Sequence, residues 1–140
     1  MTDLPSADQA GVLLTASCTT GMTDWIHGEL WLCPDGLLRR ALDFLTTVRH
    51  GPGPTVDVAN RPRRTFRPAE IESILASGRR NMWIPRVEVR GARLDVGPLP
   101  QMSLTLDLRG GRSRKLLWLP SDHVPPELLD EWVRTGRTGR

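Results

Sequence analysis

The sequence predicts one mainly β domain of the α+β class, with antiparallel strands, one short internal helix and a C-terminal helix. The chain has 140 residues, of which 39% are hydrophobic and 25% charged, and this is about the size of one globular domain. Its 13 glycines and 12 prolines favour many turns over long helices. Apolar residues alternate in several short stretches and repeat at helical spacing only near 68–77 and 125–135.

The first predicted element is a hairpin. Apolar segments at 30–33 and 37–44 flank the sequence Pro34-Asp35-Gly36, which is typical of a turn in which Gly36 takes a positive φ. Before the hairpin, residues 1–11 are expected to form a flexible arm, and ordered structure is expected to begin near Val12.

An exposed excursion is predicted at 46–81, within a domain that spans 12–135. Four prolines and two glycines between 49 and 68 exclude a regular helix there and leave room for a short strand at 55–58. In "RPAEIESILASG", Pro68 suits a first helical turn and Gly78 suits a cap, so we expect one short helix.

The second half predicts strands at 82–90 and 93–96 and a further hairpin. The stretch "MSLTLDL" alternates strictly, and Gly110-Gly111 can form a primed turn into "SRKLLWLP". Apolar residues of "PPELLDEWVRTG" then repeat at helical spacing and predict an amphipathic helix that includes Trp132. Residues 136–140 are expected to form a disordered tail.

Four segments of the chain have a shared order of apolar and turn residues: "GELWLCPDGLLRR", "WIPRVEVRGARL", "LTLDLRGGRSRKLLWL" and "LLDEWV". Together they resemble the bacterial pleckstrin-homology-like or GRAM-like pattern over about 28–135. The resemblance implies a curled antiparallel sheet or partly open β-barrel whose open end is capped by the last helix. The excursion 46–81 would then be an unusual insertion. It also implies a non-catalytic binding or adaptor module, and Trp132 would be buried.

The net charge of +3 is unevenly distributed, because 16 of the 19 basic residues follow residue 60. This basic half is the predicted contact face for a protein partner, and an anionic ligand is the alternative. The candidate binding residues are Arg61, Arg63, Arg64, Arg79, Arg80, Trp83 and Arg112. Nucleic acid is disfavoured, because aromatic and basic residues interleave only at Trp83. For Trp83, which lies between a helix cap and a strand, a packing role at the entry to the strand is favoured over a ligand contact.

No catalytic, metal or cofactor site is predicted. "HGELWLCP" has the residue types of a zinc deaminase signature but not its spacing, and adjacent Ser121-Asp122-His123 cannot form a triad unaided. A small β-barrel enzyme of the cyclase or isomerase type, with an internal apolar pocket, remains an alternative, as does anionic lipid or nucleic-acid binding. No apolar run reaches transmembrane length, so a cytoplasmic protein is expected, and a homodimer is left open.

Overall fold

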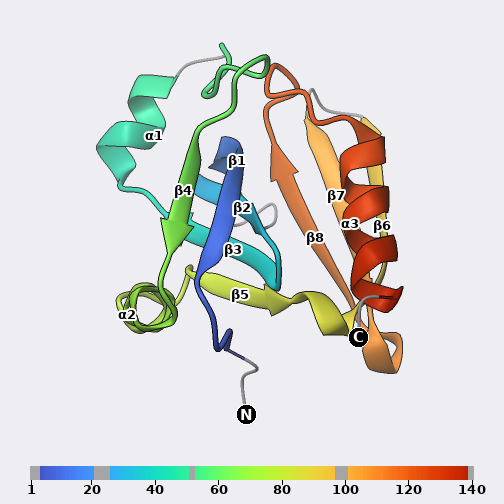
Figure 1. Cartoon of the computed structure of the whole chain (residues 1–140). Coiled ribbons are helices and arrows are strands. Elements are labelled where there is room, and N and C mark those ends of the chain that lie inside the picture. The colour runs from blue at the N-terminus through green and yellow to red at the C-terminus, as the bar shows by residue number, and fades with distance from the viewer. Residues whose placement is uncertain (1–3, 21–25, 51–52, 97–100, 139–140) are drawn as a thin grey trace.

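The fold is that of a curled β structure made of two antiparallel sheets and three helices (Figure 1). The computed structural model describes residues 4–20, 26–50, 53–96 and 101–138, with side chains described as far as Thr135. The five-stranded sheet has the order β4-β1-β2-β3-β5, and the three-stranded sheet has the order β6-β7-β8. This confirms the predicted fold class, although the two sheets do not close into a barrel.

The helices and strands follow the order that the sequence predicts, with several differences. Their bounds are β1 Gln9–Cys18, β2 Gly28–Cys33, β3 Gly36–Ala41, α1 Phe44–His50, β4 Arg63–Phe66, α2 Pro68–Ala76, β5 Met82–Pro85, β6 Val89–Val96, β7 Met102–Leu108, β8 Ser113–Trp118 and α3 Pro126–Thr138. The strand β1 and the seven-residue helix α1 were not predicted, the strand of the excursion is β4, and the strand expected at 82–90 ends at Pro85, with β6 beginning at Val89. The first strand begins at Gln9, earlier than the expected start near Val12.

The two sheets meet at a corner where β1 passes from one to the other. Thr19, just beyond β1, exchanges two backbone hydrogen bonds with Leu117 of β8, with N···O distances of 2.7 and 3.0 Å. Apolar side chains of both sheets and of α3 fill the space between them. Leu14, Leu104, Leu106 and Leu116 are completely buried in this inner cluster.

The opposite face of the five-stranded sheet carries a second, outer cluster. Leu13, Trp31 and Leu38 alternate with inward-facing neighbours and pack with Phe66 of β4 and Ile71 of α2. The strands β1 and β2 are therefore buried on both faces, which explains their almost continuous apolar sequences.

The excursion 46–81 supplies the cover for this outer face. Its strand lies at Arg63–Phe66, where it pairs with Gln9–Val12, and not at the predicted 55–58. Phe66 and Ile71 are completely buried and Val56 is 8% exposed, so the expectation of an exposed segment is wrong for these positions. The predicted helix is present as α2.

The two predicted hairpins are present, but their glycines act differently. Gly110 and Gly111 both have positive φ, 82° and 76°, as the β7–β8 turn requires. Gly36 has no positive φ. A Cβ at Gly36 would lie 2.5 Å from Trp83 Cζ2 and 2.7 Å from the carbonyl oxygen of Ile84, so close packing against β5 requires glycine there.

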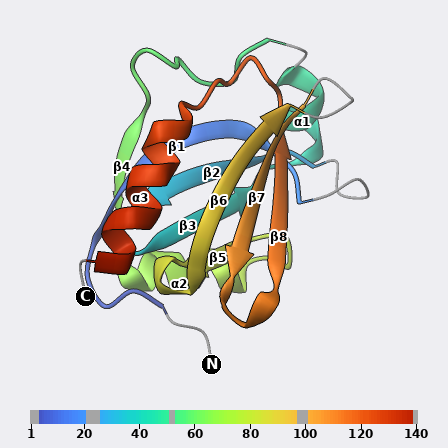
Figure 2. The same cartoon turned by 90° about the vertical axis from the view of Figure 1, so that its right-hand side faces the viewer.

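The C-terminal helix α3 lies against β6 at the end of the space between the sheets (Figure 2). Trp132 is 7% exposed, and its indole N–H donates to the carbonyl of Cys33 at 2.7 Å. The Arg86 guanidinium lies 5.4 Å from the Trp132 ring and donates to the Trp132 carbonyl and to the Pro34 carbonyl. The helix is thus tied to the β2–β3 turn, and the predicted burial of Trp132 is confirmed.

Replacing Trp132 with alanine is expected to lower the free energy of unfolding by about 3–5 kcal/mol, because the indole leaves a cavity in the inner cluster. Trp132→Phe keeps most of the apolar volume and loses the hydrogen bond to Cys33, so its cost should be smaller. Urea unfolding of both variants measures this. A Trp132→Ala variant as stable as the parent would contradict the role of α3 as a cap.

Candidate functional site

Two of the seven candidate binding residues are committed to the fold. Arg61 donates to the carbonyl of Leu14 at 2.7 Å and also to the carbonyl of His123. Partial burial lowers the pKa of the Arg61 guanidinium, and the charge of Asp122 opposes this shift. Trp83 is 7% exposed and packs in the outer cluster over Gly36, so its position fits the packing role and not an exposed ligand contact.

The other five candidates lie in three separate places. Arg63 and Arg64 are on β4, Arg112 follows the β7–β8 turn, and Arg79 and Arg80 precede β5. Figure 1 shows β4 and the β7–β8 turn on opposite sides of the molecule, so the structure does not gather these residues on one face. Arg64 is paired with Glu70, and Arg112 lies 3.3 Å from the Glu88 carboxylate.

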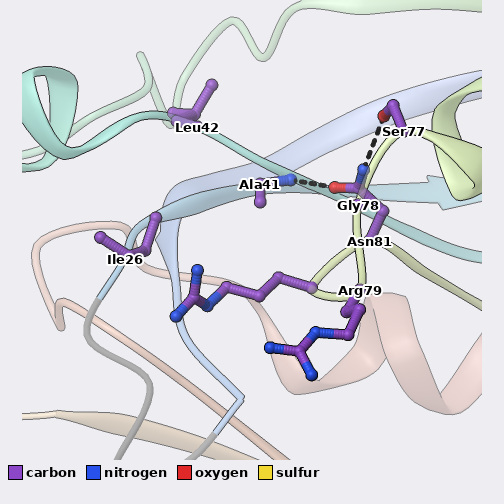
Figure 3. Close-up of a pocket in the computed structure, with 8 residues that line it drawn as sticks. Ile26, Ala41, Leu42, Ser77, Gly78, Arg79 and Asn81 are labelled. Carbon is purple, nitrogen blue, oxygen red and sulfur yellow. Dashed lines mark hydrogen bonds between the residues drawn. The ribbon is translucent and has the colours of Figure 1, made fainter.

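A surface hollow of about 420 Å³ adjoins Arg79 and Arg80. It is lined by Ile26, Ala41, Leu42, Ser77, Gly78, Arg79, Arg80 and Asn81. Figure 3 shows Ile26 and Leu42 on the side of β3 and Arg79 on the side of the turn that follows α2. Both arginines are exposed, and no acidic residue contributes to the lining. The hollow therefore offers one apolar wall and one positively charged wall.

Asn81 holds the turn that forms the charged wall. Its side-chain amide donates to the carbonyl of Ile74 at 2.7 Å and to the Ser77 hydroxyl at 3.0 Å. Its side-chain oxygen accepts from the backbone N–H of Ala41 at 2.6 Å, as Figure 3 shows. Asn81 thus connects the end of α2 to the end of β3. It also donates to the Ile74 carbonyl, whose oxygen would otherwise repel an anion.

A completely buried arginine lies next to the same turn. Arg39 of β3 donates to the carbonyl of Arg80 at 2.7 Å, to that of Cys18 at 2.9 Å and to that of Ile26 at 2.7 Å. These carbonyls belong to the end of β1, the segment before β2 and the turn before β5. The planar guanidinium of Arg39 thus links the Ile26 segment and the Arg80 turn, which line the hollow, to Cys18 at the end of the inner cluster.

Gly28 makes room for this guanidinium. A Cβ at Gly28 would lie 2.8 Å from Arg39 Nε and 3.0 Å from the carbonyl oxygen of Arg40. Any larger residue at the start of β2 would displace the Arg39 side chain from its three carbonyls. The glycine and the arginine therefore form one structural unit.

A histidine pair lies beside the apolar wall. The Nδ1 atoms of His27 and His50 are 2.6 Å apart, and the rings stack with centroids 4.9 Å apart. The backbone N–H of His27 also donates to the Thr47 hydroxyl at 2.9 Å, which ties α1 to the start of β2. Burial, followed by the charges of His50 and Arg39, lowers the pKa of His27 below its ordinary value of 6.5.

The remaining polar groups of the interior have structural roles. The buried Asp122 carboxylate accepts from the Thr15 hydroxyl at 2.6 Å, from the Ser17 hydroxyl at 3.2 Å and from the backbone N–H of Thr55 at 2.6 Å. It therefore ties the excursion to β1. Burial raises the pKa of Cys33 to about 12, and neither of the two buried cysteines forms a disulfide.

Within the described ranges, no three His, Cys, Asp or Glu side chains lie close enough together to hold a metal ion. The described helices also include none that is long and apolar enough to cross a membrane.

Sequence reasoning missed most of this site. It selected Arg79 and Arg80 as part of a broader basic face, and it did not select Arg39, Asn81 or the histidine pair. The only local signal for Arg39 is its position two residues after the inward-facing Leu37, which places both on one face of β3. The partners of Arg39 lie as much as 41 residues away in the sequence.

Comparisons with protein-family models, with curated protein sequences and with solved structures find no match to the chain.

The lowered pKa of His27 predicts a pH-dependent stability. Because the folded protein binds this proton more weakly than the unfolded chain, the free energy of unfolding should fall as the pH drops below 6.5 towards the folded-state pKa. Urea unfolding between about pH 7.5 and about pH 5.5 measures this dependence. His27→Gln should flatten the pH profile in this range. Identical profiles for the variant and the parent would contradict the prediction.

Proposed function

We propose that the chain is a non-catalytic binding module that holds an acidic and apolar segment of a protein partner in the hollow beside Arg79 and Arg80. The observation that carries this proposal is the pairing of two exposed arginines with an apolar wall formed by Ile26, Ala41 and Leu42. A carboxylate would lie against the guanidinium groups, and a neighbouring aliphatic side chain would lie against the apolar wall.

The dimensions and charge of the hollow support a small anionic group. Its volume of about 420 Å³ lies near the lower end of the range for ligand sites, roughly 300–1,000 Å³. Arg79 forms no ion pair with any residue in the described part of the chain, so a ligand carboxylate would not have to displace an internal partner.

The neighbouring helix α1 favours a protein partner over an anionic bilayer. Phe44, Leu45 and Val48 are 51%, 62% and 61% exposed, on a helix that begins two residues after Leu42 of the apolar wall. Asp43 directly precedes them, and its hydrogen bonds with Thr46 lower the pKa of its carboxyl. A charged carboxylate beside the apolar side chains would be repelled by anionic lipid, whereas a partner protein can place a donor or a cation there.

The filled interior is an argument against the barrel-enzyme alternative. An enzyme of that kind needs an internal apolar pocket with convergent polar groups. Here buried leucines and Trp118 occupy the space between the sheets, and Trp132 caps its end. Asp122 is buried among hydroxyls and backbone donors, where it stabilises the excursion.

The test uses a capped leucine–glutamate dipeptide, with binding measured by titration at low ionic strength. Combining Arg79→Glu with Arg80→Glu should weaken binding by about tenfold or more, because two attractive charges become repulsive. The backbone carbonyl of Arg80 remains available to Arg39, so the melting temperature should stay nearly unchanged.

The matched control combines Arg90→Glu with Arg109→Glu, which changes the net charge equally at two exposed positions on other elements. This control should bind the dipeptide like the parent. If both double variants bound the dipeptide equally weakly, the loss would come from the change in net charge alone, and the proposal would be contradicted. Binding to anionic vesicles without any binding of the dipeptide would contradict it in favour of a membrane.

A further inference from the structure

The strand β4 lies at the edge of the five-stranded sheet. It pairs with β1 on one side, and Figure 2 shows it at the outer border of the five-stranded sheet. The backbone N–H of Leu13 donates to the carbonyl of Pro62 at 3.0 Å, and the register then runs from Val12–Arg63 to Gln9–Phe66.

This register shows which residues of β4 face outward. Hydrogen-bonded and non-hydrogen-bonded pairs alternate in an antiparallel ladder. Since Leu13 and Pro62 form a hydrogen-bonded pair, Arg64 and Phe66 also bond to β1, whereas Arg63 and Thr65 direct their N–H and C=O groups away from it. Within the described part of the chain, no residue forms a hydrogen bond with these outward groups of Arg63 or Thr65.

The side chains around this edge are basic. Arg63, Arg64 and Arg67 are exposed. The Arg64 guanidinium lies 4.7 Å from the Phe66 ring centre and pairs with Glu70, so it is held on one face of the strand. Arg63 lies on the other face and has no ion pair with a described residue.

These charges disfavour a second copy of the chain at this edge. In an antiparallel two-fold pairing centred on Arg63, Arg64 or Thr65, an arginine faces an arginine: Arg63 with Arg63, Arg64 with Arg64, or Arg63 with Arg67. Like charges directly opposite each other destabilise a strand pair. A strand with carboxylates at the facing positions has the opposite effect.

We propose that the edge of β4 binds an extended acidic segment of a partner protein, which adds to the sheet as a sixth strand. The outward N–H and C=O groups of Arg63 and Thr65 provide the backbone pairing. A glutamate or aspartate opposite Arg63 provides the charge complementarity. Because β4 has only four residues, the segment it pairs with is short. This surface is separate from the hollow, and the proposal does not depend on the hollow's ligand.

The test uses the full chain and a synthetic peptide in which valine and glutamate alternate. Thr65→Pro removes the outward N–H and places a ring in the path of the incoming strand, while the bonds to β1 are made by neighbouring residues. The affinity should fall by about tenfold or more. Thr65→Val is the matched control, because it keeps the N–H and favours a strand, and it should bind like the parent.

Amide hydrogen exchange of the parent chain gives a second readout, which does not depend on whether Thr65→Pro is stable. In the parent chain, peptide binding should slow exchange at the N–H groups of Arg63 and Thr65, and a peptide with glutamine in place of glutamate should do so only weakly. Unchanged exchange at these two amides, or equal affinity for both peptides, would overturn the proposal. Protection in the absence of peptide, together with a dimer in sedimentation, would assign the edge to a second copy instead.

Discussion

A charged side chain is completely buried at one end of the space between the sheets, and three segments of the chain converge on it. The Arg39 guanidinium donates to the carbonyls of Cys18, Ile26 and Arg80, which lie on β1, before β2 and before β5. Without it, the carbonyl of the buried Cys18 would lose this donor, at a cost of about 1–3 kcal/mol, and the two partly buried carbonyls would lose their link to β3. The walls of the hollow keep their positions because this arginine holds the Ile26 and Arg80 segments together.

At the opposite end of the interior, the buried side chain of Trp132 of α3 covers the inner cluster. The outer face of the five-stranded sheet is covered by the excursion 46–81. Asp122 links these regions, since it follows β8 and accepts bonds from both β1 and Thr55. The fold therefore combines two apolar clusters with a buried arginine and a buried aspartate, each held by several hydrogen bonds. Buried polar groups of this kind specify a unique arrangement when their hydrogen bonds are made.

The elements that the sequence predicted well are those with local signals. The β2–β3 and β7–β8 hairpins have turn residues between apolar runs, and α2 and α3 have helical periodicity with a proline near the start. The pairing of β4 with β1 joins residues more than fifty positions apart, and neither segment specifies that register. Arg39 was not predictable for a similar reason: an arginine in a strand usually faces solvent, and only the curl of the sheet and the space at Gly28 place it inside.

Mapping the backbone amide shifts of the chain during titration with the leucine–glutamate dipeptide tests the central claim most directly. The account predicts that the largest changes fall on the lining of the hollow, at Ile26, Ala41, Leu42 and the turn at 77–81, and that the amides of β7 and β8 change little. Changes concentrated at the β7–β8 turn near Arg112, with the lining of the hollow unaffected, would contradict it.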